Sequence, residues 1–179
     1  MRTQCRLIVA LAVAWLAGGC AEHHGLALPD GAAVVEDPGL SEMSGLEASP
    51  SAPGVLWSVN DSGSRALLYR LGTDGRALGR VRVDGVWVHD WETLAVWRDR
   101  DTDWILLGDV GDNRGVRRHV RVHAIREPGP EAARARVAWT LRFRFPDGPR
   151  DAEGIAVDHG DDSLLVLSKR EARPGLYRV

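Results

Sequence analysis

Short hydrophobic runs alternate with polar turns along this chain from about residue 42 to its last residue. The runs are about four to eight residues long, rich in valine, leucine and aromatic residues, and bounded by Gly, Asp, Asn or Pro, which is typical of β-strands. Asp-Gly pairs at Asp74 and Asp147 supply residues that tight turns need. EAARARVAW, from Glu131, could also form a helical turn or two, but no run shows a sustained helical period with caps. The pattern predicts an all-β chain.

The strands recur as three copies of one pattern. The copies open with EMSGLEAS at Glu42, DWETLAVW at Asp90 and DAEGIAVD at Asp151, and we call them the first, second and third repeat. Four predicted strands per repeat, at a period of roughly 40 to 50 residues plus one insertion, are typical of β-propeller blades. We therefore expect a β-propeller of four-stranded antiparallel blades in preference to a sandwich or a barrel.

The third repeat lacks a fourth strand, so the predicted ring is incomplete. Propellers have about four to eight blades, and an open arc would expose strand edges that proteins normally pair or cover. Two explanations stay open. The chain is a fragment of a longer protein, which we favour because it stops within a strand at residues 176–179, or it closes the ring by assembling with copies of itself.

The first residues predict export. Arg2 and Arg6 precede an apolar run at residues 7–17. This run is shorter than the roughly 20 residues that a helix needs to cross a bilayer. LAGGC, ending at Cys20, resembles the lipobox of bacterial lipoproteins, in which the cysteine carries lipid. We expect a signal peptide at residues 1–19, a lipidated tether with a short strand near residues 32–35 within residues 20–37, and the partial propeller at residues 38–179. A plain signal peptide with an incidental cysteine is the alternative.

The cysteine content and the net charge limit the disulfides, the cellular location and the partners to be expected. Cys5 and Cys20 are the only cysteines, so the exported chain has no pair for a disulfide. Ala21, rather than aspartate, follows Cys20, which in lipoproteins favours the outer membrane over the inner one; we expect a cell-envelope protein that faces the periplasm or the exterior. The net charge of −2 at pH 7 provides no basic footprint, so a nucleic-acid partner is not expected.

Acidic residues occupy matching places in the repeats. Each opening has a leading acid and a second polar residue two positions on, namely Glu42 with Ser44, Asp90 with Glu92, and Asp151 with Glu153. Positions two apart share one face of a strand, so the two acids of the second and third repeats should point the same way. The second strands end near further acids, Asp61 in the first repeat and Asp109 and Asp112 in the second.

These acids should converge, because the start of one antiparallel strand lies beside the end of the next. Carboxylates that lie close together raise one another's pKa, or require a bound cation to stay ionised. Carboxylate oxygens suit Ca²⁺ or Mg²⁺, and no histidine or cysteine recurs there, which disfavours zinc. The predicted metal ligands are Glu42, Asp61, Asp90, Glu92, Asp109, Asp112, Asp151 and Glu153. The alternative is that single acids serve as turn residues that accept backbone hydrogen bonds.

Other residues near the acids have simpler expected roles. Lys169 is either a substrate clamp or a counter-charge to Glu171. Trp91 is expected to pack between blades. The histidines follow no repeat, and we expect His89, His119, His123 and His159 at the surface or at sheet edges.

Over residues 42–179 the motifs resemble those of secreted six-bladed propellers related to β-propeller phytases and the esterase-like phytase domain. The likeness rests on NDSG, DWE, GDVGDN, and DAEGIAVD followed by a strand and Lys169-Arg170. It implies that about three of six blades are present and that carboxylates on one face hold calcium, with Asp90, Glu92, Asp109, Asp112, Asp151 and Glu153 as ligands. For an enzyme, we expect Glu92, Glu153 and Lys169 to be the catalytic residues. This face offers fewer basic contacts than phytases have.

Two kinds of function follow as expectations. The first is an envelope lipoprotein that binds Ca²⁺ or Mg²⁺ and hydrolyses a small phosphorylated or ester ligand. The second is a non-catalytic propeller that serves as a scaffold for protein or ligand binding, with the acids in structural roles.

Overall fold

Eleven strands make up the regular structure in the computed structural model of this chain, which describes residues 29–61 and 65–179. No helix occurs in those residues, and none therefore offers an apolar span long enough to cross a membrane. The all-β prediction is confirmed, and the predicted helical alternative at residues 131–139 is replaced by a loop and a strand. The predicted signal peptide, Cys20 and most of the tether lie outside the described residues.

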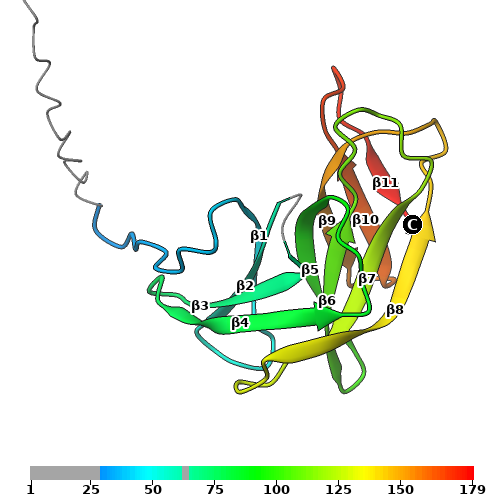
Figure 1. Ribbon diagram of the computed structural model, residues 1–179. Helices are drawn as coiled ribbons and strands as arrows, with labels where there is room; N and C mark the ends of the chain where they lie inside the picture. Colours follow the sequence, from blue (N-terminus) through cyan, green and yellow to red (C-terminus); the bar gives the residue numbers. More distant parts are fainter. Residues whose placement is uncertain (1–28, 62–64) are drawn as a thin grey trace, which may run out of the picture. The chain divides into compact units, whose positions relative to one another are not determined.

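The strands follow the three repeats. The first contains β1 (Met43–Ala48), β2 (Val55–Asn60), β3 (Leu67–Gly72) and β4 (Ala77–Asp84). The second contains β5 (Trp91–Asp99), β6 (Thr102–Asp109), β7 (Val120–Arg126) and β8 (Arg134–Phe143). The third contains β9 (Ala152–Asp158), β10 (Ser163–Ser168) and β11 (Leu176–Arg178). Within each repeat the successive strands pair antiparallel (Figure 1).

The first two repeats join into one mixed sheet. β4 and β8 pair in parallel over a short stretch, from Arg82 opposite Arg134 to Asp84 opposite Arg136. The result is an eight-stranded sheet in the order β1-β2-β3-β4-β8-β7-β6-β5, and β9 to β11 form a separate sheet. The two edge strands of the large sheet also meet, because the Ser44 hydroxyl on β1 donates to the carbonyl oxygen of Glu92 on β5 at 2.5 Å. The large sheet is therefore nearly closed and barrel-like.

The strands β5, β6 and β7 of the second repeat are largely buried on both faces, which explains their hydrophobic runs. Ile105 and Leu107 of β6 belong to a core cluster with Trp57 of the first repeat. Leu106, between them, belongs to another cluster with Leu164 of the third repeat. Alternate residues of one strand thus enter different cores. Burying such a side chain contributes about 1.5–3 kcal/mol, so these two cores fix the position of the strands around the acids.

Each first strand carries a one-residue bulge near its start. The register shifts between Ser44 and Leu46 in β1, between Trp91 and Thr93 in β5, and opposite Leu167 and Ser168 in β9. The residues without a partner opposite them are Gly45, Glu92 and Glu153. A bulge bends its strand and redirects a side chain. The bulges of β5 and β9 therefore fall at the same place in their repeats, and the bulge of β1 lies one residue later.

The segment before the first repeat differs from its prediction. The short strand predicted near residues 32–35 is wrong, because these residues form no strand. A backbone hydrogen bond from Glu36 to the carbonyl oxygen of Gly75, at 3.0 Å, ties the segment to the turn between β3 and β4. A turn offers no continuous row of backbone groups with which a strand could pair.

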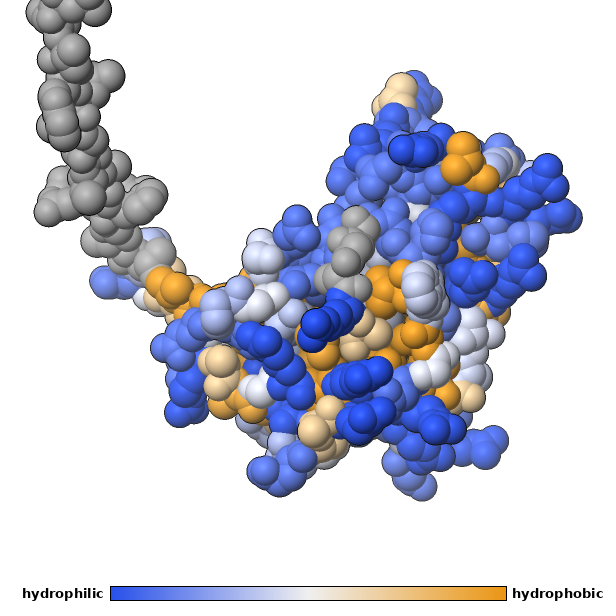
Figure 2. Space-filling model, viewed as in Figure 1, coloured by the Kyte–Doolittle hydropathy of each residue, from blue (hydrophilic) through white to orange (hydrophobic). Residues whose placement is uncertain are grey.

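The surface seen in Figure 2 is mostly hydrophilic. Hydrophobic side chains gather near the middle of the view, where β5 and β6 lie in Figure 1. Trp87, on the link between β4 and β5, is 86% exposed. Among the described residues, the connection between the first two repeats thus presents an aromatic side chain to solvent.

The contact between β1 and β5 predicts unequal effects of two glycine substitutions. Gly45 and Gly54 both have positive φ, +76° and +80°. A Cβ at Gly45 would lie 2.9 Å from the backbone nitrogen of Leu94, whereas one at Gly54 would meet nothing within 4 Å. Gly54→Ala should lower the free energy of unfolding by about 1–2 kcal/mol. Gly45→Ala should lower it by about 1–3 kcal/mol more. Urea unfolding checks this, and equal losses would contradict the contact.

Candidate metal centre

Five carboxylates from all three repeats come together at one place. Asp61, Asp90 and Glu92 form one group whose carboxylate oxygens lie within 4.8 Å of one another. Glu92 forms a second group, within the same limit, with Asp151 and Glu153. We call these five residues the acid cluster. The predicted convergence of acids is confirmed for them, and Glu92 is the member that both groups share.

Strand ends and bulges position the acid cluster. Asp90 and Asp151 directly precede β5 and β9, and Glu92 and Glu153 are the bulged residues of those strands. Gly111 lets the next loop come close, because a Cβ there would lie 2.5 Å from Asp90 Oδ2 and 2.6 Å from Glu92 Oε1. A larger residue at this position would collide with two carboxylates at once.

Glu92 lies in the least favourable environment for a negative charge. Its side chain is buried, with 4% of the residue exposed, and no described residue donates a hydrogen bond to its carboxylate. Burial, and then the negative charges of Glu153, Asp61, Asp90 and Asp151, raise the pKa of Glu92 to about 8. A cation bound here would reverse this penalty, because it favours the ionised carboxylate.

Two basic residues neutralise the outer members of the second group. Lys169 Nζ lies 2.7 Å from Glu153 Oε1, and Arg170 Nε donates to Asp151 Oδ2 at 2.5 Å. Arg170 adopts a φ of +74°, a left-handed conformation that costs about 1–2 kcal/mol in a residue other than glycine. Lys169 therefore pairs with Glu153 and not with the predicted Glu171, which instead accepts from Arg150 at 3.0 Å.

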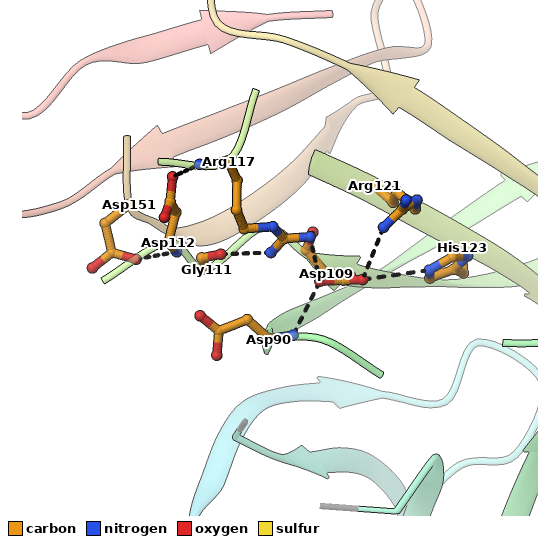
Figure 3. A network of polar contacts seen from close by, with 8 residues as sticks. All are labelled: Asp90, Asp109, Gly111, Asp112, Arg117, Arg121, His123 and Asp151. Carbon is orange, nitrogen blue, oxygen red and sulfur yellow. Dashed lines mark hydrogen bonds and ion pairs between the residues drawn. The ribbon is translucent and has the colours of Figure 1, made fainter. Parts of the chain in front are cut away.

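Asp109 lies outside both groups and is paired with arginine side chains (Figure 3). It is fully buried, and its Oδ1 accepts from Arg117 at 2.8 Å and from the backbone nitrogen of Asp90 at 3.1 Å. Burial acts to raise the pKa of Asp109, but His123 and Arg117 outweigh it and hold that pKa below its usual range. Asp109 thus positions the backbone that carries Asp90.

Asp112 also acts on a neighbour and lies outside the groups. Its backbone nitrogen donates to Asp151 Oδ1 at 2.8 Å, and its own Oδ2 accepts from the backbone nitrogen of Arg117 at 2.6 Å (Figure 3). Glu42 is exposed, and its backbone nitrogen donates to Asn60 Oδ1 at 3.3 Å. The structure does not bring Glu42, Asp109 or Asp112 into either group of predicted metal ligands.

The sequence contained a signal for the role of Asp109. Asn60 and Asp109 both end the second strand of their repeat, and each accepts a hydrogen bond from the backbone nitrogen of the leading acid, Glu42 or Asp90. Aligning the ends of the second strands would have suggested this shared structural role. Arg117 had no such signal, since it is one arginine among several in its loop.

The predicted positions of Trp91 and His123 have different outcomes in the structure. Trp91 is fully buried in the core between the first two repeats, as predicted for a packing residue. The surface position predicted for His123 is wrong, because only 5% of it is exposed and its Nδ1 lies 2.8 Å from the Thr140 hydroxyl. β7 is an inner strand of the sheet, so His123 is covered by its neighbours.

The raised pKa of Glu92 predicts a pH-dependent stability without metal. Between the ordinary glutamate pKa of 4.5 and about 8, the folded chain binds a proton that the unfolded chain has lost. The free energy of unfolding should therefore fall, by up to about 1.4 kcal/mol per pH unit, as the pH rises through this window. Glu92→Gln should remove this part of the slope, and Glu131→Gln, at an exposed loop position, should not. Urea unfolding with EDTA at pH 5 to 8 measures it; parallel curves for Glu92→Gln and the unchanged chain would contradict the assignment.

Comparisons of the chain with models of protein families, with curated proteins and with solved structures found no match. The function of the site is therefore inferred from its residues. They provide five carboxylates and two basic partners. One of the five, the buried Glu92, receives no hydrogen bond on its carboxylate from a described residue.

Proposed function

We propose that the three repeats are blades of a β-propeller and that the acid cluster lies at its axial face. The antiparallel pairing inside each repeat supports this arrangement. So do the contacts of β5 with β1 and with β9, since these are the first strands of the three repeats. The two hydrophobic cores, one on each side of the second repeat, are further support. The bulges at matching positions of β5 and β9 also support it. Further blades, or copies of the chain, would complete the ring.

The acid cluster is proposed to bind a divalent cation. The observation that carries this proposal is the buried Glu92 carboxylate, which is surrounded by four other acids and receives no hydrogen bond from a described residue. Hard carboxylate oxygens fit Ca²⁺ and Mg²⁺. Calcium is favoured, because it accepts six to eight oxygen ligands in flexible geometry, whereas magnesium usually keeps several waters and few carboxylates.

The same site is proposed to hydrolyse a phosphate or other ester, in line with the phytase-like motifs. A bound cation would polarise the ester and lower the pKa of a coordinated water. Lys169 would attract an anionic ester to the site while it orients Glu153. Glu92 and Glu153, ionised beside the cation, would accept a proton from that water. We place the protein at the outer membrane, anchored through lipid on Cys20.

A non-catalytic scaffold is the second candidate. The observation that favours it is that several acids have structural partners. Asp109 is held by Arg117, Asp112 by the backbone of Arg117, and Asp151 by Arg170 and the backbone of Asp112. On this proposal a cation, if bound, would stabilise the inner edges of the repeats without chemistry.

Calcium should stabilise the chain through Glu92. At a calcium concentration about 100 times Kd, we expect the melting temperature to rise by about 5–10 °C. Glu92→Gln should abolish most of this rise, because it removes the ligand shared by both groups. Glu47→Gln is the matched control, since Glu47 is a half-buried strand carboxylate outside the acid cluster. Differential scanning calorimetry with calcium, magnesium or EDTA measures the shift, and the absence of any cation-dependent shift would refute the proposed site.

Hydrolysis separates the enzyme from the scaffold. With calcium, the chain should cleave p-nitrophenyl phosphate or p-nitrophenyl acetate, and Glu153→Gln should reduce kcat by about 100-fold or more. The folding of this variant should change little, because the Lys169 side chain is about half exposed and ion pairs that solvent reaches contribute little to stability. Colorimetric rates and melting temperatures are measured together. A cation-stabilised chain that cleaves neither compound would support the scaffold.

A further inference from the structure

A groove lies beside the second repeat, between the loop that precedes β7 and the loop that follows β8. Its volume is about 770 Å³, and its lining includes Arg118, His119, Arg144, Phe145, Pro146 and Pro149. It shares no lining residue with the acid cluster. In Figure 2 the surface at the upper right, where Figure 1 places these loops, is mostly hydrophilic, with a small hydrophobic spot.

Positive charge concentrates in and around this groove without acidic partners. Arg118, Arg142 and Arg144 are exposed, and none of them forms an ion pair with a carboxylate of the described residues. Arg142 instead donates to His119 Nδ1 at 3.1 Å. The nearest acid along the loop after β8, Asp147, is engaged by Arg150 at 3.0 Å and by the Tyr177 hydroxyl at 3.0 Å.

Many arginines elsewhere in the described chain have carboxylate partners. Arg98 pairs with Asp103, and Arg134 pairs with Asp84 at 2.8 Å. Pairs of this kind offset the repulsion among arginines, which the groove leaves uncompensated. An anion from outside the chain would supply the missing partner.

His119 provides a further donor. Burial, followed by the charges of Arg142, Arg144, Arg121 and Arg118, lowers the pKa of His119. The neutral ring accepts from Arg142 at Nδ1, so its proton is on Nε2, which can donate to a ligand. Guanidinium and imidazole N–H groups have only donors to offer, and these match the oxygens of phosphate or carboxylate.

The base of the groove is rigid. Phe145 is buried, and its ring packs edge-to-face on Tyr177, with ring centroids 4.8 Å apart, and on Phe143, with centroids 5.7 Å apart. Pro146 and Pro149, which both follow Phe145, restrict the backbone of this loop. Little ordering of that backbone is therefore needed when a ligand binds, which favours affinity.

We propose that this groove is a binding site for a ligand with two or more oxyanion groups, held by Arg118 and Arg144 with His119 as an additional donor. The proposal does not depend on the cation site, because it uses other residues and opposite charge. The oxyanions could belong to a soluble molecule or to the headgroups of an anionic lipid surface, and the experiment distinguishes these sources.

The probe is inorganic pyrophosphate, titrated calorimetrically into the full chain after divalent cations have been removed on a chelating resin, so that no cation at the acid cluster contributes. All proteins carry Cys20→Ser to exclude lipid at that residue. Arg118→Gln with Arg144→Gln should weaken binding by about tenfold or more, since it removes two charge-assisted hydrogen-bond donors to the ligand. Arg136→Gln with Arg173→Gln changes the net charge equally at exposed positions outside the groove and should leave affinity unchanged.

Sedimentation with vesicles identifies the source of the oxyanion. Retention on phosphatidylglycerol but not on phosphatidylcholine, lost in the Arg118 and Arg144 variant and competed by pyrophosphate, would support a lipid headgroup. Pyrophosphate binding without such retention would support a soluble ligand. Failure to bind either probe, or an equal loss in both double variants, would overturn the proposal.

Discussion

Repulsion among the carboxylates around Glu92 is the constraint on which the rest of the structure depends. A buried acid beside four others opposes folding, and the chain offsets this by burying hydrophobic residues next to it. Trp91 and Leu94, on the same strand, are buried in the core between the first two repeats. The other core, between the second and third repeats, holds Ala152 beside Glu153. The acids are close together because two cores on either side of the second repeat hold them there.

Hydrogen-bond donors, more than residue type, divide the acids by role. Asp109 and Asp151 each accept from an arginine and from a backbone nitrogen, so each charge has a partner within the chain, although Oδ2 of Asp109 receives no hydrogen bond from the part of the chain that the structure describes. The Glu92 carboxylate has the same chemistry but receives no hydrogen bond from an arginine or a backbone nitrogen of the described residues. This contrast makes Glu92 the best-supported ligand for a cation, and it makes Asp109 a residue that positions others.

The loop between β6 and β7 links the two proposed sites. Near its start, Gly111 and Asp112 contact the acid cluster, and at its end Arg118 and His119 line the cationic groove. Arg117 lies between them and ties the loop to Asp109 and to the carbonyl oxygen of Gly111. One loop therefore serves a negative and a positive surface, and Arg117, between them, neutralises Asp109 at the end of β6.

Much of the fold was predictable from local patterns, and much of the site was not. Alternating hydrophobic residues and Asp-Gly turns predicted the strands, because strand periodicity and turn chemistry act over a few residues. The prediction of a strand near residues 32–35 was wrong, because a strand also needs the edge of another strand to pair with, and no local pattern provides one.

The repeated acid motif by itself determined that acids from successive repeats, among them Asp90, Glu92, Asp151 and Glu153, would converge. Only the tertiary structure decided which of them would keep a neutralising partner. Arg117 reaches Asp109, Arg170 reaches Asp151, and the bulges turn Glu92 and Glu153 toward one point. These outcomes depend on contacts between residues far apart in the chain and on a one-residue shift in register, and neither is encoded in the spacing of one strand.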